Sequence, residues 1–157
     1  LLKTFGNTYF SPKSYNNYLG VPLSLCNLNY NDEYGVFEIG MSKKGEIKTL
    51  SNLVKPDIAI ITNVAEAHIE NFKDLKGIAK AKAEIIQNIK ENGTLILNRD
   101  DKFFSFFNQI ANKRKLKIIT FGSNSNSEIK LNSNFKTKNH HLASVKTPNK
   151  IIKIKYK

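Results

Sequence analysis

Three residues, Glu38, His68 and Lys82, have types and positions suited to chemistry. Glu38 ends the short apolar run 34–39, and His68 follows the next run, 57–62. Ligands of an open parallel sheet lie beyond the carboxyl ends of its strands, so both residues are candidates for a binding site. Each also has a structural explanation, because an acid at a strand end is often a solvated loop residue or a helix cap, and a single histidine is more often structural than a ligand.

Lys82 interrupts an apolar stripe at the helical period, formed by Ile78, Ile85, Ile86 and Ile89. Lysine is seldom buried without a partner. One interpretation is that its ammonium reaches past the stripe to water. The other is that desolvation keeps the amine neutral, so that it adds carbon dioxide and becomes a carbamate, an oxygen ligand suited to Mg²⁺. Glu38, His68 and Lys82 would then converge on the ligand edge of the sheet.

Alternating apolar runs and helical stretches must position these residues. The runs bounded by turn residues resemble strands buried on both faces: 34–39, 57–62, 94–98 and 117–121, with a short strand at 9–10 before them. Helices are expected at 46–54, 75–91 and 101–113. Strand–helix–strand repetition predicts an α/β fold, a doubly wound, mostly parallel sheet with helices on both faces.

The pattern changes after Gly122. Residues 128–136, 141–146 and 150–157 alternate as strands do and are separated by turns. We expect a small C-terminal antiparallel sheet in 124–157, appended to a parallel α/β core in 1–123.

The positive charge of the chain is local. A length of 157 residues suits one domain, and the formal net charge is +12. Residues 1–101 carry 12 basic and 12 acidic side chains, whereas 102–157 carry 13 and 1. Only Arg99 and Arg114 are arginines, the residue that specific readers of phosphates and bases favour. We therefore expect no specific nucleic-acid partner, although a basic nucleic-acid-binding module in 128–157 remains an alternative of another class.

Other classes of protein fit poorly. Cys26 is the single cysteine, which excludes a disulfide scaffold and fits a reducing compartment. No apolar run approaches the ~18 residues of a membrane span, and the first residues do not have the layout of a signal peptide. The start at Leu1 reads as a cut through a helix closed by Gly6, so we expect a fragment of a longer protein.

Ordered blocks between Gly6 and Asp101 resemble the central domain of the Mur ligases, the ATP-dependent amide-bond-forming enzymes of peptidoglycan precursor synthesis. The blocks are residues 14–23, 36–41, 45–47, 56–64, 67–70, 78–85 and 97–101. The resemblance implies the fold expected above and a role as the ATP-binding, catalytic domain.

The resemblance also implies roles for single residues. The glutamate that matches Glu38 binds the Mg²⁺ that bridges the ATP phosphates. The residues that match His68 and Lys82, the latter carbamylated, hold a second Mg²⁺ near the reacting carboxylate. Asn16 and Asn17 fall in a loop that faces the nucleotide-sugar substrate and the phosphates. Asn98, Asp100 and Asp101 match a block with a structural or nucleotide-binding role.

The block 38–40, together with 45–47, is most similar to the family member that adds D-Ala-D-Ala to UDP-MurNAc-tripeptide through an acyl phosphate. This implies a monomeric enzyme of the bacterial cytoplasm, of which the present chain alone would be inactive. Another Mur-type ligase and an enzyme like folylpolyglutamate synthase are the alternatives within the class.

The chain departs from the family pattern in three respects. It contains no G-x-x-x-x-G-K-[ST] loop, which the family carries shortly upstream of the position of Leu1. The family's glycine-rich stretch after the histidine reads Glu70-Asn71-Phe72-Lys73 here, and Ala83 replaces a usual glycine. None of these departures removes a candidate metal ligand.

Overall fold

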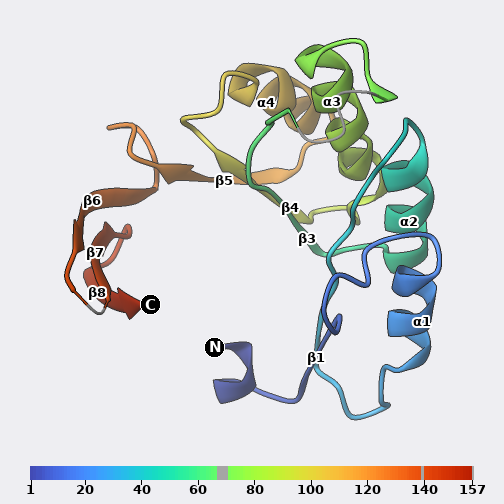
Figure 1. Ribbon diagram of the computed structural model, residues 1–157, viewed down its shortest axis with the longest axis horizontal. Coiled ribbons are helices and arrows are strands. Elements are labelled where there is room, and N and C mark those ends of the chain that lie inside the picture. Colours follow the sequence, from blue (N-terminus) through green and yellow to red (C-terminus); the bar gives the residue numbers. More distant parts are fainter. Residues whose placement is uncertain (67–70, 139, 157) are drawn as a thin grey trace. The chain divides into compact units, whose positions relative to one another are not determined.

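The computed structural model describes residues 1–66, 71–138 and 140–156. The chain divides into two compact units (Figure 1). Unit 1 comprises Leu1–Pro56 and Ala65–Lys90, and unit 2 comprises Asp57–Val64 and Glu91–Lys157. Each unit is described by itself below.

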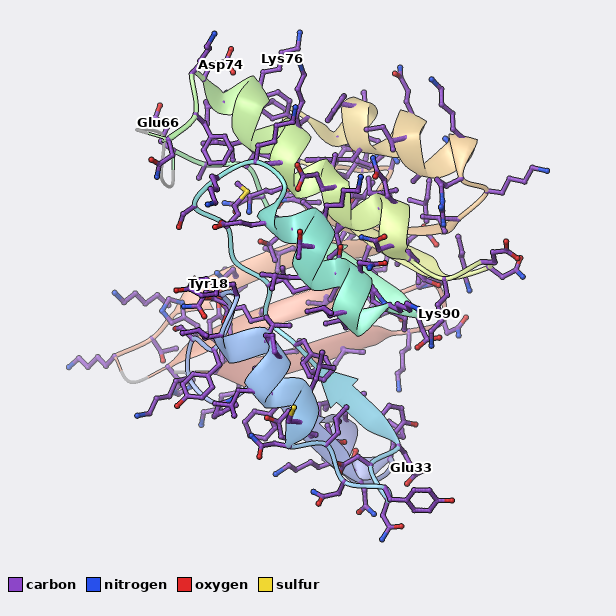
Figure 2. The ribbon with its side chains drawn as sticks, turned by 90° about the vertical axis from the view of Figure 1, so that its right-hand side faces the viewer. Tyr18, Glu33, Glu66, Asp74, Lys76 and Lys90 are labelled. Carbon is purple, nitrogen blue, oxygen red and sulfur yellow. The ribbon has the colours of Figure 1, made fainter. Side chains whose placement is uncertain are left out.

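Unit 1 is mainly helical. Its elements are η1 (Leu2–Thr4), β1 (Thr8–Phe10), α1 (Gly20–Cys26), β2 (Tyr34–Val36), α2 (Glu46–Val54), α3 (Leu75–Lys82) and the 3₁₀ helix η3 (Ala83–Asn88). Strands β1 and β2 pair in parallel, and α2 packs against α1, α3 and η3 (Figures 1 and 2). Val21, Ile78 and Ile86 are fully buried. Burying one such side chain contributes about 1.5–3 kcal/mol to folding, which makes this helix packing the main source of stability in the unit.

Local chemistry sets the ends of these helices. Gly45 precedes α2 with a φ of +91°, a left-handed conformation that glycine adopts without strain. Pro56 follows the left-handed C-cap of α2 and cannot continue a helix. Asp74 accepts a hydrogen bond from the Gly77 amide at 2.7 Å and caps α3, at whose start Figure 2 labels it.

Unit 2 is a six-stranded sheet with one helix. The strands are β3 (Ile58–Ile61), β4 (Thr94–Asn98), β5 (Lys117–Gly122), β6 (Ile129–Lys136), β7 (His141–Lys146) and β8 (Ile151–Tyr156), and they lie in sequence order. Pairing is parallel from β3 to β6 and antiparallel from β6 to β8. Helix α4 (Phe104–Lys113) packs on β4 and β5, and its Phe107 is buried.

The expected fold class is confirmed: the protein is α/β, with a mostly parallel sheet and antiparallel strands at the C-terminal end. The antiparallel strands continue the same sheet, because β6 pairs with the end of β5 at Phe121 and Gly122.

The prediction that the strands are buried on both faces is wrong for two of them. The expected strand 34–39 shortens to β2, whose three residues are all exposed. In β3 the exposed Ile58 and Ile60 alternate with the buried Ala59 and Ile61. The alternation in β3 means that one face of this strand is uncovered, and β2 belongs to a two-stranded sheet.

Two helices also differ from expectation. The short helix α1 was not predicted, and the expected helix 75–91 is α-helical only as far as Lys82 before it continues as η3. The change of helix type breaks the 3.6-residue period, so Ile85 does not share the complete burial of Ile78 and Ile86. Among the described residues, no helix combines the length and apolar character needed to cross a membrane.

Candidate functional site

Glu38 lies two residues beyond the end of β2, with an exposed side chain. Its Oε1 accepts a hydrogen bond of 2.7 Å from the Nδ2 of Asn16. Within the described part of the chain, Oε2 accepts no hydrogen bond. The carboxylate is therefore held on one side and available on the other, which suits a ligand for a hard cation that keeps most of its coordination for water and phosphate.

The loop before α1 supplies this contact. The backbone oxygen of Asn16 accepts a hydrogen bond from the Gly40 amide at 2.8 Å, so the loop is joined to the segment that follows Glu38. The neighbouring Asn17 has a different task, because its Oδ1 accepts hydrogen bonds from the Leu19 and Gly20 amides at the start of α1. The two asparagines, grouped together in the sequence prediction, thus separate in the structure.

Lys82 is the last residue of α3 and is half-buried. Of the residues of the expected stripe, Ile78 and Ile86, four residues before and after Lys82, are fully buried. His68 lies outside the described residues, so the expected convergence of Glu38, His68 and Lys82 stays a prediction. Among the residues that are described, no group of three or more His, Cys, Asp or Glu side chains could hold a metal ion.

Glu84 is a structural acid that the sequence did not reveal. Its carboxylate accepts hydrogen bonds from the Gly45 amide at 2.9 and 3.1 Å and from the Lys48 amide at 3.1 Å. It thereby places negative charge at the N-terminus of α2, where the helix dipole favours it. Glu84 belongs to the block 78–85, but nothing in that block indicates partners almost 40 residues upstream.

In unit 2, Asp101 joins two loops at the carboxyl end of the parallel strands. Its Oδ2 accepts a hydrogen bond of 2.6 Å from the Val64 amide, beyond β3, and its Oδ1 accepts one of 2.7 Å from the Phe103 amide, before α4. Both oxygens are occupied by backbone donors. Asp101 therefore shapes the ligand edge of the sheet through the backbone.

Asp100 does the same for the loop after β5. Its two carboxylate oxygens accept hydrogen bonds from the amides of Ser123 at 2.6 Å and Asn124 at 2.9 Å. A Cβ on Gly122 would lie 2.8 Å from this carboxylate, so only glycine leaves room for it. Asn98 accepts a hydrogen bond from the Asp100 amide at 2.9 Å and completes the turn. The block 98–101 binds the loops after β3, β4 and β5 to one another.

The whole chain, residues 1–157, matches the family profile described as the Mur ligase middle domain. Several similar proteins carry the name UDP-N-acetylmuramoyl-tripeptide–D-alanyl-D-alanine ligase, among them the following two. The one from Buchnera aphidicola subsp. Acyrthosiphon pisum is 45% identical over 105 residues, which are 67% of this chain and 23% of the relative. The one from Escherichia coli is 35% identical over 144 residues, which are 92% of this chain and 30% of the relative.

Solved structures give the same picture. A crystal structure of MurF from Acinetobacter baumannii has a TM-score of 0.91 at 27% identity and covers 98% of this chain and 33% of that one. MurF ligase from Thermotoga maritima, in complex with ADP, has a TM-score of 0.86 at 26% identity and covers 99% and 35%. The apo form of L. casei FPGS, at 14% identity and a TM-score of 0.62, covers 78% of this chain and 29% of that one, and the likeness is one of fold alone. The chain spans between a fifth and about a third of the relatives it matches.

Proposed function

The chain belongs to the Mur ligase family, and from this premise we propose that it is the middle domain of an ATP-dependent ligase that joins D-Ala-D-Ala to UDP-MurNAc-tripeptide. The observation that carries the proposal is the match to relatives of that name, 35% identical over 92% of the chain in the case of Escherichia coli. A fold similarity with a TM-score of 0.91 to a MurF structure supports it. A bacterial, cytoplasmic, monomeric enzyme of peptidoglycan synthesis belongs to the same proposal.

We assign two parts to this domain, a parallel α/β core in 1–123 and an antiparallel extension in 124–157. The 157 residues contain no glycine-rich P-loop sequence, so the proposal places the loop that cradles the ATP phosphates in a preceding part of a longer enzyme. Regions that bind the UDP sugar and the incoming dipeptide would flank the domain. The chain by itself would then be inactive.

The proposed reaction has two steps. The γ-phosphoryl group of ATP passes to an oxygen of the tripeptide carboxylate: a new P–O bond forms, the bond to ADP breaks, and an acyl phosphate results. The amine of D-Ala-D-Ala then attacks the carbonyl carbon, the C–O bond to phosphate breaks, and the amine gives up a proton as the amide forms. Both groups that meet in the first step are anions, so the site must offset their repulsion.

Two Mg²⁺ ions would supply that positive charge. Glu38 would hold one of them through Oε2, the oxygen with no hydrogen-bond partner among the described residues. His68 and Lys82 would hold the other, with Lys82 as a carbamate formed when its neutral amine adds carbon dioxide and loses a proton. Lys82 is half-buried at the end of α3, between the buried Ala81 and Ala83.

Asn16, Asn17, Asn98 and Asp101 were expected on the cofactor side. The hydrogen bonds of the last three favour an indirect role, because Asn17 binds backbone amides just before α1 and Asn98 and Asp101 shape the loops at the ligand edge of the sheet. We propose that they position the nucleotide-binding loops.

The test is substrate-dependent turnover of the complete enzyme. With UDP-MurNAc-tripeptide and ATP, release of ADP and phosphate should require D-Ala-D-Ala, and mass spectrometry should find the pentapeptide product. Single amino acids and a folate substrate with glutamate are the comparison arms. Equal turnover with a single amino acid would assign the chain to another Mur-type ligase, and turnover with folate and glutamate would assign it to a folylpolyglutamate synthase.

Lys82→Ala tests the proposed carbamate. In the complete enzyme we expect ligation to fall by at least about 100-fold, because an oxygen ligand to the metal is lost. Added formate or acetate should restore part of the rate by supplying a carboxylate in its place. Full activity of the variant would exclude the carbamate.

A further inference from the structure

We infer that Asn16 is a positioning residue for Glu38: its amide holds Oε1 of the carboxylate and leaves Oε2 as the oxygen that binds a divalent cation. The inference rests on the proposed function, in which Glu38 is a metal ligand. It gives Asn16 a task different from the contact with substrate or phosphates that its place in the sequence implied.

The hydrogen bond between Asn16 and Glu38 is short. The Nδ2 of Asn16 donates to Oε1 of Glu38 at 2.7 Å, at the short end of the range for an amide nitrogen and a carboxylate. Glu38 is exposed and lies two residues beyond the end of β2, so packing does not select one conformation of its side chain. An unrestrained glutamate would lose rotamer entropy each time it bound a cation. The hydrogen bond removes part of that freedom beforehand.

Asn16 is itself fixed. Its backbone oxygen accepts the Gly40 amide at 2.8 Å. A Cβ on Gly40 would lie 2.9 Å from the Cγ of Asn16, 3.0 Å from Nδ2 and 3.1 Å from Oδ1. The side-chain amide therefore lies directly against the backbone of Gly40, in a space that any other residue at position 40 would reduce. Gly40 and Glu38 are two residues apart, so one short segment holds the asparagine and receives its hydrogen bond.

The neighbouring Asn17 contrasts with Asn16. Its side-chain oxygen accepts hydrogen bonds from the amides of Leu19 and Gly20, which lie at the start of α1. Of the two adjacent asparagines, Asn16 is the one that reaches Glu38. Asn17 therefore stabilises its own loop, whereas Asn16 is the partner of the carboxylate.

Groups that hydrogen-bond to a metal ligand fix its orientation, and their loss lowers metal affinity by roughly 10–100-fold. Because Glu38 is exposed and water can partly replace the amide, we expect a loss near the lower limit, about 10-fold, for Asn16→Ala.

The experiment measures metal binding without turnover. Mn²⁺, a probe for the Mg²⁺ site, is titrated into the complete enzyme in the presence of ADP, and free Mn²⁺ is counted by electron paramagnetic resonance. The variants are Asn16→Ala, Glu38→Ala and the two combined. Asn27→Ala is the matched control, because its exposed side-chain amide also donates one hydrogen bond, to the backbone oxygen of Leu23 at 2.9 Å. Thermal unfolding verifies that each variant is folded.

We expect Mn²⁺ to bind about 10-fold more weakly to Asn16→Ala and with unchanged affinity to Asn27→Ala. Adding Asn16→Ala to Glu38→Ala should cause no further loss of Mn²⁺ affinity. An additive loss in the double variant would overturn the inference, since Asn16 would then act independently of Glu38. Wild-type affinity in Asn16→Ala, with weakened binding in Glu38→Ala, would overturn the inference and leave the proposed function standing. Unchanged affinity in Glu38→Ala would overturn the proposed metal role itself.

Gly40→Ala provides a second route that leaves both polar residues in place. The added methyl group should displace the Asn16 amide and weaken Mn²⁺ binding in the same way. In the Asn16→Ala background the methyl group has room, so Gly40→Ala should cause no additional loss. A further loss of Mn²⁺ affinity in that background would contradict the proposed role of Asn16 in holding Glu38.

Discussion

Two loop regions at strand ends use carboxylates in opposite ways. In unit 1, Glu38 accepts one side-chain hydrogen bond and keeps its second oxygen without a hydrogen bond from the described residues. In unit 2, Asp101 gives both oxygens to backbone amides. The sequence offers little to distinguish them, since each acid lies shortly after a strand in a block shared with the Mur ligases.

The hydrogen-bond partners of an acid at a strand end distinguish a structural role from a ligand-binding one. A carboxylate that accepts two backbone amides stabilises the loops around it, and a ligand would have to displace those bonds. A carboxylate held on one side by a side-chain amide is oriented and can still bind a cation. Removal of Glu38 should therefore affect mainly activity, whereas removal of Asp101 should affect mainly stability.

The largest expected effect is on catalysis. If the proposed function holds, Glu38→Ala in the complete enzyme should lower the rate of D-Ala-D-Ala ligation by at least about 100-fold, because the proposed metal ligand is lost. The midpoint of thermal unfolding should move little, because Glu38 is exposed and its one hydrogen bond, from the Asn16 amide, is exposed too, so water can replace it. Steady-state kinetics and thermal unfolding of the same preparation measure both. A large loss of stability would place Glu38 with the structural acids and end the contrast.

Asp101→Ala should have the opposite profile. It leaves the amides of Val64 and Phe103 without their acceptor, which we expect to cost on the order of 2–3 kcal/mol. Hydrogen exchange, read by mass spectrometry on peptides that contain these two residues, should accelerate. Unchanged exchange together with a loss of ligation as large as that of Glu38→Ala would make Asp101 a functional acid.

Gly122→Ala should have a smaller effect on stability. Gly122 has a φ of +145°, and a Cβ there would meet the Asp100 carboxylate at 2.8 Å. We expect a loss of about 1–2 kcal/mol, seen as a lower unfolding temperature of the complete enzyme. Asp100→Ala removes the collision and leaves the strained φ, so the two losses should not add. Strict additivity would show that the carboxylate does not limit the space at position 122.

The smallest effect is expected for Glu84→Gln. Glutamine keeps an acceptor for the Gly45 and Lys48 amides and removes the charge at the N-terminus of α2. The dipole contribution of that charge is about 0.3–1 kcal/mol, so the unfolding temperature should fall slightly, and less at high salt. A drop as large as that of Asp101→Ala would mean that Glu84 does more than cap the helix.

Much of the fold could be predicted where local signals mark both ends of an element. Helix α2 has the predicted bounds, 46–54, since Gly45 precedes it and Pro56 follows it. Strand β4 likewise occupies the predicted residues 94–98. The strands of the antiparallel sheet were located within two residues, because alternation and turn residues coincide there.

What could not be predicted depends on partners far away in the sequence. The change from α3 to η3 at Lys82 coincides with the hydrogen bonds that Glu84 and Asn88 make to α2, with sequence separations of 36 to 40 residues. Asn17 accepts hydrogen bonds from the amides at the start of α1, although in the sequence it resembles a functional asparagine. The contact between Asn16 and Glu38, 22 residues apart, is likewise a product of the tertiary fold.

The position of β8 in the sheet bears on whether the lysine-rich C-terminal region associates with itself. The strand is the outermost of the six, and Lys153 and Lys155 alternate in it with Ile152 and Ile154. The outer strand of a sheet can pair with the same strand of another molecule and start an aggregate. Two such strands would bring lysines of like charge together, and their repulsion opposes this pairing. The positive charge of this region would therefore oppose self-association at that edge.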